Sequence, residues 1–258
     1  MAAACILCQD PLVLDVDDTS DDEQPSSSSA ALSDPKTIPD DVELSCGDHF
    51  HWQCLLDAWT GPLCPACQKD VTAISPPSTT QVLVTLTNEG GVQPHLDIAP
   101  LLNEEAYLRQ HPEHRVCRAF LELCSEGDVP AIVDLLRDCD GPAEEDDDDD
   151  EQRRPNAVDV LRYRDPLGEM RSGLHAAVAG SSREVAWLLL LLASELDELE
   201  FPALVYQEAA SLGVMRQDQR GMVDIRTLRD ADGRTAEDLA AEMGGVWHGW
   251  VGNGRLAV

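Results

Sequence analysis

Apolar residues follow two kinds of spacing along this chain of 258 residues, one typical of a strand and one typical of helices. Residues 81–87 (Gln-Val-Leu-Val-Thr-Leu-Thr) alternate β-branched with other residues, which predicts a short strand, and Asn-Glu-Gly-Gly at 88–91 predicts a turn. From residue 101 onwards apolar residues recur at helical spacing. The pattern therefore predicts an α-rich chain, with helices in residues 101–258 and a linker carrying one strand in residues 71–100.

Two stretches lack such a pattern. Residues 9–45 contain an acidic run and the low-complexity segment Pro-Ser-Ser-Ser-Ser-Ala, and residues 141–155 contain a run of aspartates. Neither stretch can bury a core, so both are expected to be solvated loops. The longest apolar run, residues 185–193, is too short for a membrane span of about 18 residues, so no membrane partner is expected.

Cysteines and histidines cluster in the first 67 residues. Cys5 and Cys8 are three positions apart, as are Cys64 and Cys67, and between these pairs lies Cys46-Gly-Asp-His49-Phe-His51-Trp-Gln-Cys54. A two-residue gap lets one backbone turn direct two side chains at one ion, and thiolate and imidazole are ligands that zinc prefers. The spacing predicts two zinc sites in residues 1–70.

Disulfides are the alternative use of these cysteines. They need an oxidising compartment, and the chain opens with Met-Ala-Ala-Ala without the basic and apolar regions of a secretory signal. We therefore expect a cytoplasmic or nuclear protein whose clustered cysteines bind metal. Cys117, Cys124 and Cys139 lack such spacing and are expected to be buried apolar residues.

The cysteine and histidine pattern resembles the RING finger family in its Cys/His form. The resemblance rests on Cys46-Gly, on Phe50-His51-Trp52-Gln-Cys54-Leu55, and on Cys64-Pro65-Ala-Cys67. It implies a small ββα-type cross-brace in which ligand pairs alternate between two Zn²⁺ ions. The first ion would take Cys5, Cys8, His51 and Cys54; the second would take Cys46, Cys64, Cys67 and one residue between Cys46 and His51.

Two residues compete for this last position. Aligned without a gap, the family pattern places Asp48 there, whereas imidazole is chemically the better ligand in a mostly thiolate site. Against His49, residues two apart in an extended segment point to one side, although His49 and His51 would serve different ions. We expect His49, with Asp48 as the alternative.

The resemblance also implies a function. RING domains dock a ubiquitin-conjugating enzyme and hold its thioester in a reactive geometry, without a covalent intermediate of their own. Leu7 and Pro65 match apolar docking positions of the family. Trp59 matches a docking tryptophan but follows Cys54 by five residues where four is usual. Gln68 stands where the most active members carry Arg or Lys, which puts full activity in doubt.

The helical part resembles ankyrin repeats. Ser172-Gly-Leu-His175-Ala-Ala-Val-Ala, followed by Ser-Ser-Arg-Glu184-Val185, has the turn, small-residue helix and leucine-faced helix of that family, and Asp230-Ala-Asp-Gly233-Arg-Thr235-Ala is a second match. We expect an ankyrin-like array over residues 101–258, with the atypical outer units that such arrays have. His175 is expected to be a hydrogen-bonded residue at a helix start.

Charge restricts the partners further. The formal charge is −31, so a nucleic-acid partner, which needs Lys and Arg patches, is not expected. No nucleotide-binding loop or nucleophile motif is visible, so enzymatic function would come from the RING-like part. Two hypotheses follow: a RING-type ubiquitin ligase whose repeats bind an unknown protein substrate, or a non-catalytic zinc-stabilised scaffold.

Overall fold

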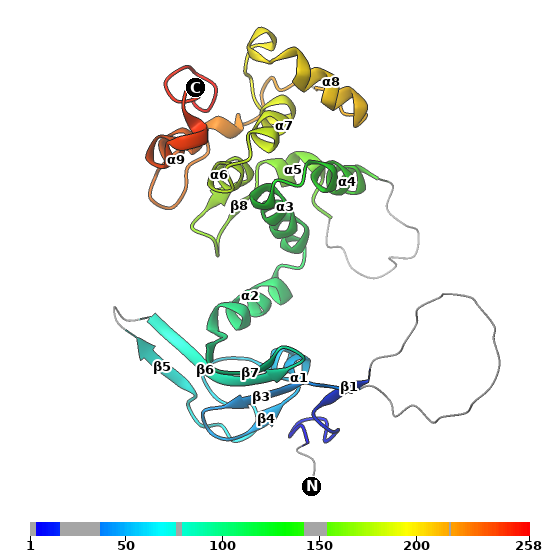
Figure 1. The fold of residues 1–258 in the computed structure, drawn as a ribbon, viewed down its shortest axis with the longest axis vertical. Helices are drawn as coiled ribbons and strands as arrows, with labels where there is room; N and C mark the ends of the chain where they lie inside the picture. The colour runs from blue at the N-terminus through cyan, green and yellow to red at the C-terminus, as the bar shows by residue number, and fades with distance from the viewer. Residues whose placement is uncertain (1–3, 16–36, 76–78, 142–153, 217) are drawn as a thin grey trace, which may run out of the picture. The chain divides into compact units, whose positions relative to one another are not determined.

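The computed structural model describes residues 4–15, 37–75, 79–141, 154–216 and 218–258. Most of the acidic and serine-rich insert and most of the aspartate run lie outside these ranges. The chain forms two compact units, Met1–Gln110 and His111–Val258. Figure 1 shows strands only in the first unit apart from one short hairpin, and helices in both. None of the described helices is long and apolar enough to cross a bilayer.

The first unit is built on antiparallel strands. Strand β3 (Asp41–Leu44) pairs with β4 (His49–Phe50) on one side and with the long strand β6 (Thr79–Asn88) on the other. β6 also pairs with β5 (Thr72–Ser75) and β7 (Gly91–Asp97), which completes a five-stranded sheet. A separate antiparallel ladder pairs β1 (Val13–Asp15) with β2 (Thr37–Pro39) and so brings the two ends of the acidic and serine-rich insert together.

The segment expected to be a linker is part of this core. Val82 and Val84 of β6 are buried together with Val42, Phe50 and residues of helix α1 (Trp52–Ala58). Helix α2 (Ala99–Gln110) adds Leu102 to the same cluster. The cysteine-rich part is too small to bury its own apolar residues, and the strands after it supply the missing surface.

The second unit is a group of helices. It contains α3 (His114–Glu126), α4 (Val129–Asp140), α5 (Ala157–Leu161), α6 (Gly173–Ala179), α7 (Arg183–Ala193), α8 (Ala203–Ser211) and α9 (Ala236–Met243). Short 3-10 turns lie at Glu198–Glu200, Ile225–Thr227 and Gly245–Trp247. A two-stranded hairpin, β8 (Arg164–Asp165) with β9 (Arg171–Ser172), precedes α6.

Local sequence explains the two helix pairs of this unit. Gly127, with φ of 85°, ends α3, and the side chain of Asp128 accepts a hydrogen bond from the Ala131 amide to begin α4. Ser182 caps α7 in the same way. The helix–loop–helix predicted from residues 172–190 is thereby confirmed.

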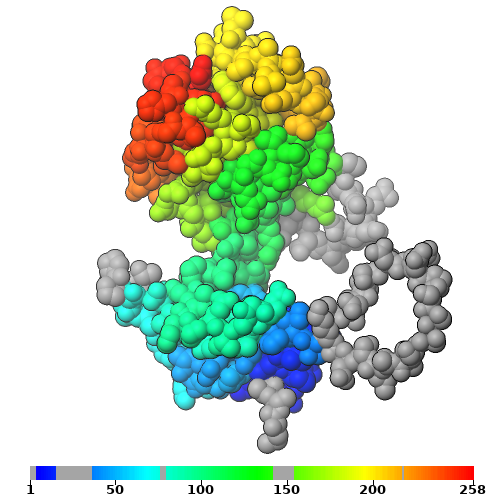
Figure 2. Space-filling view, viewed as in Figure 1, coloured from blue at the N-terminus to red at the C-terminus, as the bar shows by residue number. Residues whose placement is uncertain are grey.

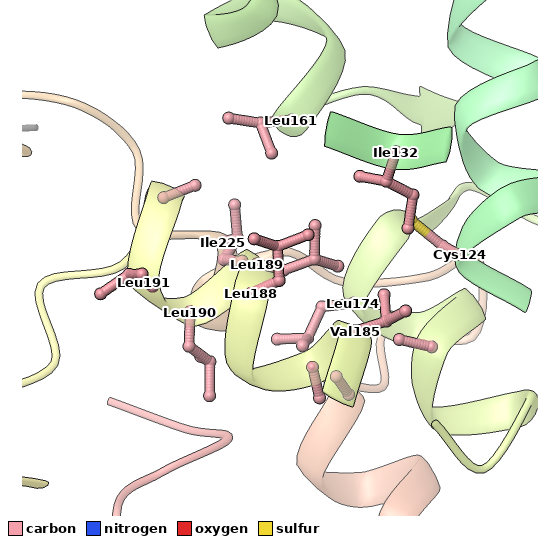
Figure 3. Packing of buried hydrophobic residues seen from close by; sticks show 14 of the residues in the cluster. Cys124, Ile132, Leu161, Leu174, Val185, Leu188, Leu189, Leu190, Leu191 and Ile225 are labelled. Atoms are coloured by element: carbon pink, nitrogen blue, oxygen red, sulfur yellow. The ribbon is translucent and has the colours of Figure 1, made fainter. Parts of the chain in front are cut away.

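The core of the second unit lies along α7. Its leucines contact buried residues of the neighbouring helices, as Figure 3 shows for Leu161, Leu174 and Ile132. Helix α6 packs against α3, α7 and α9. Trp247 and Trp250 of the C-terminal segment, whose surface is red in Figure 2, belong to this core.

The expectation of an α-rich chain with an ankyrin-like array is wrong. The described chain is mixed α/β, because residues 71–100 add strands to the sheet of the first unit. In the second unit, helices of 5 to 13 residues alternate with a strand hairpin and 3-10 turns, so the helices do not form a uniform series.

Candidate metal centre

The first cluster joins the start of the chain to helix α1. Cys5 and Cys8 lie in one turn, closed by a hydrogen bond from the Gln9 amide to the Cys5 carbonyl at 2.9 Å. His51 and Cys54 lie at the start of α1. Nδ1 of His51 is 3.2 Å from Sγ of Cys8 and 3.8 Å from Sγ of Cys54. All four candidate ligand atoms are within 4.8 Å of one another.

The second nitrogen of His51 fixes the ring. Nε2 lies 2.8 Å from the carbonyl oxygen of Pro11, which only accepts, so Nε2 carries the proton and donates it. Nδ1 therefore directs its lone pair towards the sulfur atoms. An outer hydrogen bond of this kind orients a ligating histidine.

The second cluster consists of Cys46, Asp48, Cys64 and Cys67. Oδ2 of Asp48 lies 3.3 Å from Sγ of Cys46 and 3.2 Å from Sγ of Cys64. Gly47 has φ of 87°, which lets the chain reverse between Cys46 and Asp48. A hydrogen bond from the Gln68 amide to the Cys64 carbonyl closes the turn that carries the last two cysteines.

His49, the fourth ligand that we expected, is not in this cluster. It lies in β4, paired with Glu43 of β3, and its Nδ1 is 2.8 Å from Oδ1 of Asp41. Asp48 immediately precedes the strand, in the turn that faces the cysteines. The structure therefore brings the alternative residue, Asp48, to the thiols and not His49, because strand pairing determines which of the two side chains faces the cysteines.

Burial opposes ionisation of several of these thiols. Burial, together with the neighbouring thiols, raises the pKa of Cys46 to about 12 and that of Cys54 to about 12. Burial also opposes ionisation of Cys5, but hydrogen bonds from nearby backbone amides, including that of Cys8, lower its pKa to about 7. At neutral pH the thiols of Cys46 and Cys54 would ionise only beside a cation, which a divalent metal supplies.

The donor spacing fits zinc. Ligands at about 2.0–2.3 Å from a tetrahedral ion are about 3.5–3.8 Å apart, and the sulfur–nitrogen and sulfur–oxygen separations of 3.2–3.8 Å in the two clusters are close to this value. The two clusters also use alternating ligand pairs along the chain. The prediction of two groups able to hold zinc in a cross-brace-like arrangement is confirmed.

The expected docking residues differ in their exposure. Leu7 is 38% exposed, and Ile6 and Leu63, which the sequence reading missed, are 46% and 44% exposed. Pro65 is half-buried and Gln68 exposed. The signal for Ile6 and Leu63 was present in the sequence, since both are apolar residues next to the ligand turns.

Trp59 is only 6% exposed and belongs to the core of the first unit. Helix α1 ends at Ala58, and Trp59 takes an extended conformation at the C-cap. Arg109 of α2 donates to the carbonyl oxygens of Asp57 and Trp59, at 2.8 and 3.1 Å. The ring of Trp59 therefore packs inwards, and the docking role expected for this residue stays a prediction.

The backbone of Gln68 has φ of 60°. Its side-chain nitrogen Nε2 lies 3.2 Å from the Cys64 carbonyl oxygen and 3.3 Å from the Pro65 carbonyl oxygen. The side chain thus folds back over the turn that carries the last two cysteines.

No known protein family, curated protein or solved structure matches this chain.

Proposed function

We propose that the first unit is a two-zinc RING-type module that docks a ubiquitin-conjugating enzyme, and that the chain acts as a ubiquitin ligase. The observation that carries the proposal is the interleaving of the two clusters, in which Cys5 and Cys8 join His51 and Cys54 while Cys46 and Asp48 join the last cysteine pair. This ligand order is the one that the RING resemblance implies.

The exposed apolar residues support docking. Ile6 and Leu7 lie in the first ligand turn, and Leu63 lies directly before the last one. A few apolar anchors supply most of the energy in a small interface. The module would act by binding and orientation, since a RING forms no covalent intermediate.

The second unit is proposed to bind the protein substrate. It has its own core, and its surface includes exposed apolar residues such as Leu204, Met215 and Val223. Separate units would let one part of the chain hold the substrate and the other hold the conjugating enzyme.

A zinc-stabilised scaffold without ligase activity is the second candidate. Two observations favour it: Trp59 is buried, and the neutral side chain of Gln68 is hydrogen-bonded to its own turn. An in-vitro assay of ubiquitin-chain formation with a panel of conjugating enzymes separates the two. Chains that require the zinc-loaded protein support the ligase; their absence with every enzyme supports the scaffold.

A further inference from the structure

A third group of metal-ligating side chains lies in the second unit, outside the two cysteine clusters. His111, Glu113 and His114 bring their candidate ligand atoms within 4.8 Å of one another. Nδ1 of His111 is 3.4 Å from Oε1 of Glu113, and Nε2 of His114 is 3.8 Å from the same oxygen. One carboxylate oxygen is therefore close to a ring nitrogen of each histidine.

The local backbone holds this group together. The His114 amide donates to the His111 carbonyl at 3.0 Å, and the Arg115 amide donates to the Pro112 carbonyl at 3.1 Å. Pro112 also restricts the backbone between the first two ligands. Three ligands on one hydrogen-bonded turn need little ordering when an ion binds.

The rings are positioned by their neighbours. The imidazoles of His111 and His114 stack with centroids 5.4 Å apart and an interplanar angle of 20°. The ring of Tyr163 contacts His114 edge-on, at a centroid distance of 5.0 Å. All three ligands are half-buried, so an ion could reach them from solvent.

Two imidazoles and one carboxylate form a ligand set found in zinc sites that keep one coordination position open. Nitrogen and oxygen ligands of a tetrahedral zinc ion are about 3.4 Å apart, close to the separations of 3.4 and 3.8 Å seen here. The N-terminal end of α3 disfavours a bound cation, and the negative charge of Glu113 at this end opposes that effect.

We propose that His111, Glu113 and His114 form a third zinc site with one open coordination position, which water or a donor atom of a bound partner would fill. With no thiolate, this site binds zinc more weakly than the cysteine clusters do. The proposal does not depend on the function of the first unit.

The test uses the full chain at a buffered free-zinc concentration. Elemental analysis should find three zinc ions per wild-type chain and two in Glu113→Gln and in His114→Ala. His248→Ala, which removes an exposed histidine from the same unit, should retain three. Far-UV circular dichroism would verify that each variant is folded. If Glu113→Gln or His114→Ala does not fold, His111→Ala replaces it.

Cobalt provides a second readout. The third equivalent of Co²⁺ should add visible absorption without the sulfur-to-cobalt charge-transfer band that the cysteine clusters produce, and Glu113→Gln should lack this addition. A wild-type chain that holds only two ions at free zinc high enough to saturate simple histidine sites would overturn the proposal. So would folded variants that keep the third ion.

Discussion

Nε2 of His51 lies 2.8 Å from the carbonyl oxygen of Pro11, 40 residues earlier in the chain. This bond spans the acidic insert and fixes the ring whose other nitrogen faces the thiols of Cys8 and Cys54. The first metal cluster is thus tied to the segment just before β1 as well as to its own ligands.

Removal of zinc should unfold mainly the metal-binding part of the chain. Cys5 and Cys64 are core residues of the first unit, and loss of the ions would leave their buried thiols without a countercharge. Hydrogen exchange followed by mass spectrometry should show a large loss of protection in residues 5–68 after chelation, with α6 and α7 unchanged. Equal loss in both units would contradict this expectation.

The fourth ligand of the second cluster can be tested by single substitutions. Asp48→Ala should cost the second cluster its zinc ion, because Oδ2 of Asp48 lies beside two of its sulfurs. His49→Ala should retain that ion, since it removes only the partly exposed contact between the His49 ring and the Asp41 carboxylate. The zinc content of each variant would be measured after a chelator has removed weakly held metal. Loss of the ion in His49→Ala but not in Asp48→Ala would identify His49 as the ligand.

Docking of a conjugating enzyme should depend on Leu7. Leu7→Ala should reduce ubiquitin-chain formation at least tenfold, about 1.4 kcal/mol, while zinc content is unchanged. Ile74→Ala is the matched control, because Ile74 is an 81% exposed apolar residue elsewhere in the first unit. Equal activity of Leu7→Ala and wild type would show that the docking surface lies elsewhere.

A charge at position 68 should raise activity. Gln68→Arg replaces a neutral amide that binds its own turn with a permanently charged donor, which holds ubiquitin more strongly against the enzyme. Initial rates of chain formation would measure the gain, with Lys69→Arg as a charge-conserving control. If Gln68→Arg and wild type are equally inactive with every conjugating enzyme, the scaffold function replaces the ligase.

The Arg226–Asp224 pair should be important for the second unit. It is almost fully buried at 2.7 Å, and Arg226 also donates to the carbonyls of Gly254 and Ala257 near the C-terminus. Arg226→Met should destabilise the unit by about 3–5 kcal/mol, because it leaves Asp224 buried without its partner. Urea unfolding would measure the loss of stability. Arg220→Met is the control, because Arg220 forms an exposed ion pair, and this variant should leave the urea midpoint unchanged.

Stability should also fall in mild acid because of His175. The ring is fully buried, with Nε2 3.1 Å from the Arg234 carbonyl, and burial lowers its pKa below the ordinary value of 6.5. Above pH 6.5 the folded and unfolded states are both neutral at this site, and the contribution to stability is complete. As the pH falls below 6.5 the unfolded state takes up the proton first, at a cost of up to about 1.4 kcal/mol per pH unit.

The measurement for His175 is the difference between two proteins. Urea unfolding of wild type and His175→Gln at several pH values between 5 and 8 should give a steeper decline for wild type. Because both proteins carry the same cysteine clusters, acid-induced zinc release cancels in the difference. Parallel curves would mean that His175 does not titrate differently in the folded and unfolded states.

Features that depend on near neighbours follow directly from the amino-acid sequence. The turns at Cys5–Cys8 and Cys64–Cys67 follow from two-residue gaps, and the pair α6–α7 follows from helical spacing with serine caps. His175 was expected at a helix start and forms a capping box with Ser172. Each of these depends on contacts within a few residues, which the order of amino acids shows directly.

Features that depend on distant pairing follow only from tertiary contacts. The pairing of β3 with β4 holds His49 beside Asp41 and leaves Asp48 to the thiols. The pairing of β3 with β6 brings an expected linker into the core. The end of α1 at Ala58 turns Trp59 inwards. The direction and burial of a side chain depend on which element packs against its own, and the local sequence pattern does not identify that element.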